Sequence, residues 1–232
     1  APSERQFTAN LSTGYNAMYF DRDFQSFNKG AITKKSPYEL KGMPEAFKVS
    51  DEDFSHDNLR MTWKKPLPDL TASLSYGDRF FNNKLGVMLS GSFLNTYRGK
   101  ESEIYYQPGR DVNNTETRNY SDQQTRIGAH AKFDYHISPK HKLTWYNGYM
   151  RETEVRDRLD KKEGYVRMRW NRQYIVNSTL KGEHSFLADN ALHLSWSAVV
   201  SKAFNETPDN NEISLLGGGD RVAVNRALIK RW

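Results

Sequence analysis

The chain has 232 residues, a net charge of +6, no Cys and a mean hydropathy of −0.85. The missing Cys excludes disulfides, thiolate metal sites and cysteine nucleophiles, and no run of 18 apolar residues is present to form a membrane-spanning helix. Aromatic residues make up 13% of a chain that is only 37% hydrophobic, which is too many for a disordered protein. This combination predicts a β-protein whose strands are apolar on one face only.

Alternation of apolar and polar residues predicts seven strands along the chain. The clearest case is 126–137, where Ile127, Phe133 and Tyr135 occupy one face, and His130 and Asp134 occupy the other. The seven expected strands, in chain order, cover 7–19, 70–80, 85–97, 126–137, 142–151, 172–184 and 191–202.

The strands are long, and their connections alternate in length. About ten residues or more per strand exceeds the usual five or six, and it is the length that a tilted strand needs to cross a bilayer. Short Asn-, Pro- and Ser-containing turns are expected at 81–83, 138–141 and 186–190, and long polar loops at 21–68, 98–124 and 152–171. Short turns on one side and long loops on the other are typical of outer-membrane barrels.

The predicted fold class is therefore all-β, with antiparallel up-and-down transmembrane β-barrel strands forming a partial barrel. Tyr and Trp at the borders of an apolar band are typical of a membrane interface. The aromatic residues expected in that role are Tyr19, Tyr76, Phe80, Tyr97, Tyr135, Trp145 and Trp196. An alternative that the alternation leaves open is a soluble, β-sandwich-like carbohydrate-binding domain, in which apolar faces pack against one another.

The expected ligand contacts lie in the external loops. Tyrosine rings stack on sugars or other ring systems, and Asn and Asp side chains bond to hydroxyl groups. The candidate ligand-binding residues are Tyr105, Tyr106, Asp111, Asn113 and Asn114.

No enzymatic, cofactor or metal site is expected. His130 and His136 share a strand face but lie about 20 Å apart, which is too far to share an ion. Acidic groups such as Glu152 and Glu154 lie in polar segments, and no GxSxG, HExxH or phosphate-loop motif is present. Nucleic acid is not an expected partner, because most strand aromatics lie on the apolar face, away from the charges.

Several segments resemble TonB-dependent outer-membrane receptors of the type common in Bacteroidetes. The resemblance covers roughly 7–212 and rests on FTANLSTGYNAMYF, PDLTASLSYGDRFFNNKLGVMLSGSFLNTYRGKESEIYY, SPKHKLTWYNGYMRETEVRDR and YIVNSTLKGEHSFLADNALHLSWSAVVSKAFNETPDNNE. It implies location in the outer membrane of a Gram-negative cell and energised uptake of a siderophore, glycan, cobalamin or peptide.

The family's members have a 22-stranded barrel, a plug and a segment that contacts TonB, and this sequence resembles only part of the barrel. We therefore expect 1–232 to be part of a receptor barrel, with the plug and the remaining strands absent. The resemblance also implies its partners. These are the lipid bilayer, the nutrient, a surface lipoprotein, and the TonB complex only through the missing N-terminal part.

Overall fold

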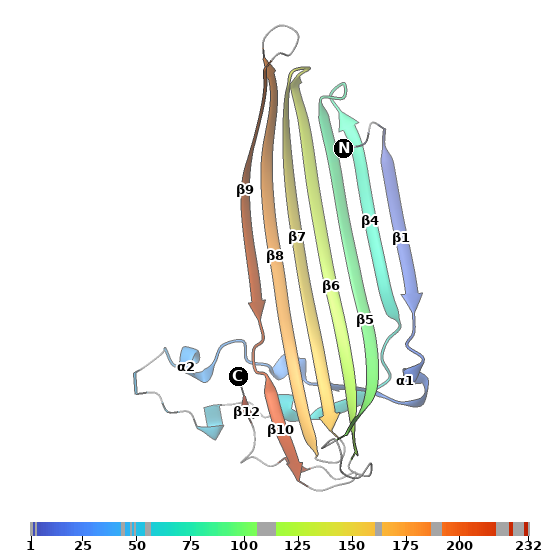
Figure 1. Cartoon of the computed structure of the whole chain (residues 1–232), viewed down its shortest axis with the longest axis vertical. Helices are drawn as coiled ribbons and strands as arrows, with labels where there is room; N and C mark the ends of the chain where they lie inside the picture. The colour runs from blue at the N-terminus through green and yellow to red at the C-terminus, as the bar shows by residue number, and fades with distance from the viewer. Residues whose placement is uncertain are drawn as a thin grey trace.

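The computed structural model describes residues 2, 4–42, 45–46, 48, 50–53, 57–105, 115–160, 164–186, 192–216, 223–224 and 230–231. Most of them form one antiparallel sheet in which each long strand pairs with the next along the chain (Figure 1). The predicted all-β fold class, with up-and-down antiparallel strands, is confirmed, and the open sheet is consistent with a partial barrel.

The sheet contains ten strands, in the order β1-β4-β5-β6-β7-β8-β10-β11, with β9 also paired to β8 and β12 to β10. Strand β8 therefore pairs along one part of its length with β9 and along another part with β10. The bounds are β1 Gln6–Gly14, β4 Asp69–Phe80, β5 Leu85–Tyr105, β6 Thr115–Ser138, β7 His141–Asp160, β8 Tyr165–Phe186, β9 Leu192–Glu206, β10 Asn211–Leu216, β11 Ala223–Val224 and β12 Lys230–Arg231.

The short turns lie together at one end of the sheet, at the top in Figure 1. Between β4 and β5, Phe81, Asn82 and Asn83 all adopt positive φ angles of 54°, 52° and 66°. Asn tolerates this left-handed region better than most residues, which suits it to such a turn. In the turn expected at 186–190, Phe186 is still the last residue of β8, and the remaining positions lie outside the described residues.

At the opposite end, two of the expected long loops are mostly strand. β5 and β6 stay paired out to Tyr105 and Thr115, and β7 and β8 out to Asp160 and Tyr165. In β5 and β6 these outer parts carry little apolar alternation. In β8 the alternation is present, because Val166, Met168 and Trp170 share one face and Arg167 and Arg169 share the other, although the strand was expected only from residue 172. Backbone pairing and side-chain ion pairs extend the ladder there.

The third long connection, residues 15–68, folds into a compact segment that we call the cap. Its elements are α1 Met18–Asp21, β2 Phe24–Phe27, η1 Lys29–Ala31, α2 Pro37–Leu40, η2 Asp51–Asp53, η3 Asp57–Leu59 and β3 Met61–Lys64. β2 and β3 pair in a separate two-stranded sheet. Helix α2 begins with a capping box, in which the Ser36 side chain accepts from the Glu39 backbone N–H and Glu39 accepts from that of Ser36.

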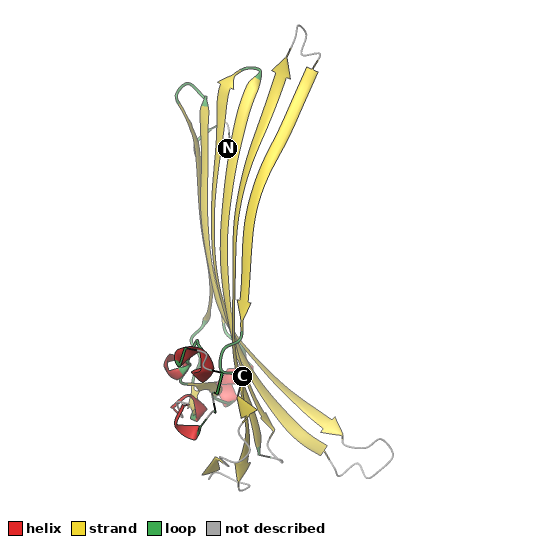
Figure 2. Ribbon diagram, turned by 90° about the vertical axis from the view of Figure 1, so that its left-hand side faces the viewer, coloured by secondary structure: helices red, strands yellow, loops and turns green. Residues whose placement is uncertain are grey.

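The cap covers one face of the sheet, and only in the half away from the short turns (Figure 2). The buried core lies between the two. Its larger cluster joins Phe27, Ile32 and Leu59 of the cap to Val155, Val166, Met168 and Ile213 of the sheet. A smaller cluster contains Tyr19, Phe24 and Tyr97.

Candidate membrane-facing surface

Strand register defines an apolar band in the half of the sheet nearest the short turns. Residues directly opposite each other in antiparallel strands point to the same side, so one face can be followed in rows across the strands. The band comprises five rows. The row at the turn end contains Phe80, Leu85, Tyr135, Leu143, Gly182 and Trp196. The fifth row contains Leu11, Ala72, Phe93, Ile127, Arg151, Tyr174 and Phe204.

The four steps from the first row to the fifth span about 27 Å along the strands, at two residues a step. This is on the scale of the apolar band of outer-membrane barrels, about 25 Å tall. The side chains of the band are open: Leu11 is 76% exposed, Leu89 43% and Val200 74%. An apolar surface of this extent normally contacts a partner or a lipid phase.

A polar row closes the band on the side of the cap. It contains Thr13, Leu70, Asn95, Thr125, Thr153, Arg172 and Glu206. The Thr125 hydroxyl donates to Asn95 Oδ1 at 3.0 Å, and Arg172 pairs with Glu206. Beyond this row the same face becomes apolar again, at Val155, Met168 and Val166, where the cap buries it.

The predicted interface aromatics fall into three groups. Phe80, Tyr135 and Trp196 lie in the first row, and Trp145 lies one step further in. Tyr76 lies near the middle of the band, opposite Leu89, and its hydroxyl donates to Asp78 Oδ2 at 2.9 Å. A role at the membrane interface stays a prediction for these residues.

Tyr19 and Tyr97 do not lie on an exposed border. Tyr19 is fully buried in α1, and Tyr97 is 6% exposed. Both rings contact Phe24 edge-on, with centroid distances of 5.5 Å and 5.0 Å. The expected placement fails because the chain turns into α1 after β1 and folds back over β5, which the alternation alone did not indicate.

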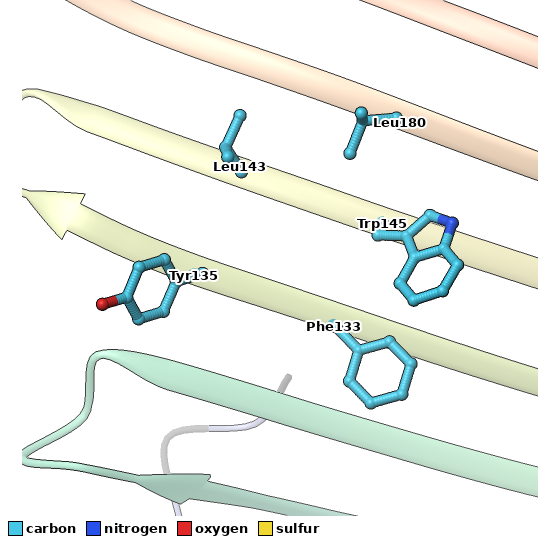
Figure 3. A pocket seen from close by; sticks show the side chains of 5 residues that line it. All are labelled: Phe133, Tyr135, Leu143, Trp145 and Leu180. Carbon is cyan, nitrogen blue, oxygen red and sulfur yellow. The ribbon is translucent and has the colours of Figure 1, made fainter.

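A shallow hollow of about 390 Å³ lies within the band, lined by Phe133, Tyr135, Leu143, Trp145 and Leu180 (Figure 3). The five side chains come from three neighbouring strands, β6, β7 and β8. Phe133 and Trp145 lie with ring centroids 5.6 Å apart. The lining is almost wholly apolar, which suits a hydrocarbon chain and offers little to orient a polar ligand.

Behind the middle of the band, the reverse face of the same strands is more polar than the band, although Met88, Met150, Ile175 and Val199 also lie on it. One row there contains Ser75, Ser90, His130, Gly148, Asn177 and Ser201. His130 Nδ1 and the Tyr146 hydroxyl lie 2.6 Å apart. Arg79 and Asp134 form a mostly buried ion pair at 2.9 Å on this face, nearer the short turns.

Further from the short turns, the reverse face carries a ladder of ion pairs on β6 and β7. The pairs are Arg126–Glu152 at 2.6 Å, Arg156–Asp122 at 2.9 Å, Arg156–Glu154 at 2.8 Å, Arg158–Asp160 at 3.0 Å and Arg118–Asp160 at 3.2 Å. The Arg158 guanidinium lies 4.9 Å from the centre of the Tyr165 ring. Burial, together with a hydrogen bond to Glu212, raises the pKa of Tyr165 to about 12.

Close contacts fix the position of the cap on the sheet. The Gln25 backbone N–H donates to Ser121 Oγ at 3.3 Å, and Lys29 Nζ donates to Gln123 Oε1 at 2.9 Å. Gly99 faces α1 so closely that a Cβ there would lie 2.7 Å from Met18 Sδ and 2.7 Å from the Tyr19 hydroxyl. A side chain at this position would push the cap away from β5.

Asp157 is a buried carboxyl beneath the cap. It is fully buried, and neither of its carboxylate oxygens has a hydrogen-bond partner among the described residues. Burial raises the pKa of Asp157 well above its ordinary value and the negative charge of Asp122 raises it further, whereas Lys29 opposes the shift. The cap therefore covers a carboxyl group, that of Asp157, whose neutral, protonated form is favoured.

Of the five predicted ligand-binding residues, one lies among the described residues. Tyr105 is the last residue of β5 and pairs with Thr115. Tyr106, Asp111, Asn113 and Asn114 lie outside the described residues. A ligand site on this loop stays a prediction.

Two other kinds of feature are absent from the part of the chain that the structure describes. Within the described part of the chain, no group of three or more His, Asp or Glu side chains is arranged to hold a metal ion. No helix among the described residues combines the length and the apolar character needed to span a membrane.

Comparisons of the chain with protein-family models, with curated proteins and with solved structures found no match. Functional inference therefore rests on the geometry of the sheet and on its sequence.

Proposed function

We propose that this chain is a segment of the barrel wall of a TonB-dependent receptor in the outer membrane of a Gram-negative cell. The whole receptor would take up a nutrient, namely a siderophore, glycan, cobalamin or peptide, by energised transport. The segment supplies lipid-facing wall, polar lining and outer loops. Interaction with the TonB complex would pass through other parts of the receptor.

The observation that carries this proposal is the exposed apolar band. It crosses seven neighbouring strands, it has aromatic residues in its first row, and its reverse face is more polar. In a soluble sandwich a second sheet would cover such a band. Among the described residues, the only other sheet is β2–β3, and it lies over the opposite half of the face.

Site-directed labelling tests the assignment of the two faces. This chain has no Cys, so an engineered thiol is the only one within it. We expect Leu89→Cys to react with a lipid-soluble maleimide and Ser90→Cys with a water-soluble one, in outer membranes of cells that produce the protein. Equal reactivity of the two neighbours toward both reagents would contradict a lipid-facing band.

Accessibility in intact cells tests the orientation. Labels placed at Asn113, which lies between β5 and β6 in the sequence, should react with an impermeant reagent applied from outside. Labels at Asn82, in a short turn, should react only after the outer membrane is opened. The opposite pattern would place the short turns outside the cell.

Uptake assays test the transport function itself. Cells with and without the protein are compared for uptake of ferric chelates, cobalamin, oligosaccharides and peptides, in the presence and absence of TonB. We expect one class to depend on both. If none does while the labelling succeeds, the chain is a membrane wall without this transport role.

A further inference from the structure

The cap lies on the same face of the sheet as the exposed apolar band. Gly99, Ser121, Asp157 and Met168 form one row beneath the cap. This row continues the face of Leu89 and Ala131, because the pairings from β4 to β8 run without a register shift between the two levels. If the band faces lipid, the cap stands outside the wall, above the membrane surface, and does not line the channel.

The border between the band and the cap carries basic residues. The band contains three charged residues, Asp78, Arg151 and Lys202, and Asp78 pairs with Arg5 at 2.7 Å. Arg151 is exposed and has no acidic partner among the described residues. Lys202 is also exposed, and its Nζ lies 4.6 Å from the centre of the Phe204 ring.

Arg151 and Lys202 lie in the two rows nearest the cap, on strands separated by β8. Strand spacing places their Cα atoms roughly 12 Å apart. Tyr174 lies in register between Arg151 and Phe204, and it stacks on Phe204 with a centroid distance of 4.8 Å. Two cations beside stacked aromatic rings at the edge of an apolar band match the chemistry of a phosphate-bearing lipid surface.

The edge of the cap adds exposed apolar side chains at the end of β1 and β4. Phe20 is 70% exposed and Leu67 is 68% exposed. Lys65 ties their two segments together, because its Nζ donates to the backbone oxygens of Tyr19 and Phe20, both at 3.1 Å, and of Arg22 at 3.2 Å. We call Phe20 and Leu67 the cap edge.

We propose that the cap is a membrane-surface element, in which the cap edge, together with Arg151 and Lys202, binds phosphate-bearing headgroups of the outer leaflet. This inference rests on the proposed function, because it needs the apolar band to face lipid. It assigns the partner as lipid headgroups and places the cap on the outside of the wall. The cap then supports the wall at the membrane surface and leaves the polar reverse face open to the channel.

Environment-sensitive labels test the position of the cap edge. Phe20→Cys and Leu67→Cys are labelled with a polarity-sensitive fluorophore in outer-membrane vesicles, with Lys100→Cys as the control. Lys100 neighbours Gly99, which lies beneath the cap, and its side chain points to the reverse face. It therefore lies at the level of the cap along the strands, but on the opposite face of the sheet. We expect headgroup nitroxide lipids to quench the labels at 20 and 67, and aqueous iodide to quench the label at 100.

A label at Leu89→Cys, in the middle of the band, distinguishes failure of this inference from failure of the proposed function. Lipid quenching at 89 together with iodide quenching at 20 and 67 would overturn the inference and leave the membrane wall intact. Iodide quenching at 89 as well would overturn both. Lipid quenching at all three positions supports both.

Charge removal tests the chemistry of the partner. Each basic residue near an anionic membrane surface contributes about 1 kcal/mol, so Arg151→Ala and Lys202→Ala should each lower the affinity for a phosphorylated glycolipid about fivefold. Binding of the dephosphorylated glycolipid should not change. Arg169→Ala is the matched control, because this β8 residue lies on the reverse face opposite Arg156. Equal losses in all three variants would overturn the assignment of the headgroup site.

Discussion

One continuous face of the sheet is exposed in the half near the short turns and buried in the other half. Near the short turns, the face is apolar and open, and the side chains behind it are mixed, with ion pairs such as Arg79–Asp134 and Lys142–Glu183 close to the turns. Near the long connections, the same face is buried beneath the cap, and the side chains behind it form a ladder of ion pairs. The same strands therefore carry an exposed surface in one half and a buried core in the other. The polar row that includes Asn95 and Thr125 lies between the two.

The comparison shows two ways in which the apolar side chains of one sheet are placed: buried beneath the cap, or exposed in the band. Beneath the cap, Val166 and Met168 are completely buried by side chains of the chain itself. In the band, Leu89 and Val200 have no such cover among the described residues. Substitutions in the capped half should therefore respond to packing within the chain, and those in the band to the surrounding phase.

A charge in the middle of the band should have the largest effect. Leu89→Arg is expected to destabilise the membrane-inserted protein by roughly 2–4 kcal/mol, because the cation would lie near the bilayer midplane. Ser90→Arg, its neighbour on the polar reverse face, should cost much less. Unfolding by denaturant in lipid vesicles measures both, and equal penalties would remove the distinction between the two faces.

A side chain at Gly99 should disrupt the capped half and leave the band unaffected. Gly99→Val is expected to weaken cap docking by about 2 kcal/mol, because its Cβ would overlap the side chains of Met18 and Tyr19. Hydrogen exchange of the β2 amides measures this effect. Gly91→Val is the matched control on the same strand and face, since its Cβ would meet only a backbone oxygen, at 3.9 Å. Unchanged exchange in Gly99→Val would mean that α1 does not press on β5.

Neutralising the buried carboxyl beneath the cap should strengthen docking at high pH. The pKa of Asp157 is raised in the folded state, so the cap is most stable below the ordinary carboxyl pKa of about 3.9 and loses stability as the pH rises toward the raised value. Asp157→Asn should remove this loss, a gain on the order of 1 kcal/mol. The same β2 amides, followed from pH 4 to pH 8, provide the measurement.

Asp21→Asn serves as the control for the pH dependence, because Asp21 is an exposed carboxyl in α1. It should keep the pH dependence of the parent protein. A parent protein whose cap protection is independent of pH would show that Asp157 is not held in its protonated form.

The smallest effect is expected from the ion pairs of the reverse face. Arg156→Ala removes the contacts with Asp122 and Glu154, and the Arg156 side chain is 43% exposed. We expect a cost of about 0.2–1 kcal/mol, reduced by added salt, because solvent screens exposed pairs. Denaturant unfolding at low and high ionic strength tests this, and a cost that does not depend on salt would indicate a packing role for Arg156.

The sequence was sufficient to predict the band. Alternation over 126–137 predicted the inner part of β6, and Asn82 and Asn83 predicted the turn between β4 and β5. Both signals are local: one reflects a surface with two unlike faces, and the other reflects a backbone that needs positive φ.

The capped half was not predicted. At the start of β8 a signal was present, because Val166, Met168 and Trp170 alternate with polar residues, but the strand was expected only from residue 172. Residues 118–124 are polar on both faces, so their strand conformation depends on pairing with β5 and β7, which periodicity does not report. Tyr19 and Tyr97 looked like border aromatics because each lies near the end of an expected strand. Their burial depends on Phe24, a residue of the cap that approaches them only in the folded chain.

The pairing of β6 with β7 has a mechanical consequence. It runs from Arg118 opposite Asp160 to His136 opposite Lys142 with no register shift in between. Hydrogen bonds along this whole length oppose sliding of one strand past the other. A pull on one strand at the end near Arg118 is therefore shared with its partner along the hairpin, and the ladder of these described residues has no break at which the two strands could slip.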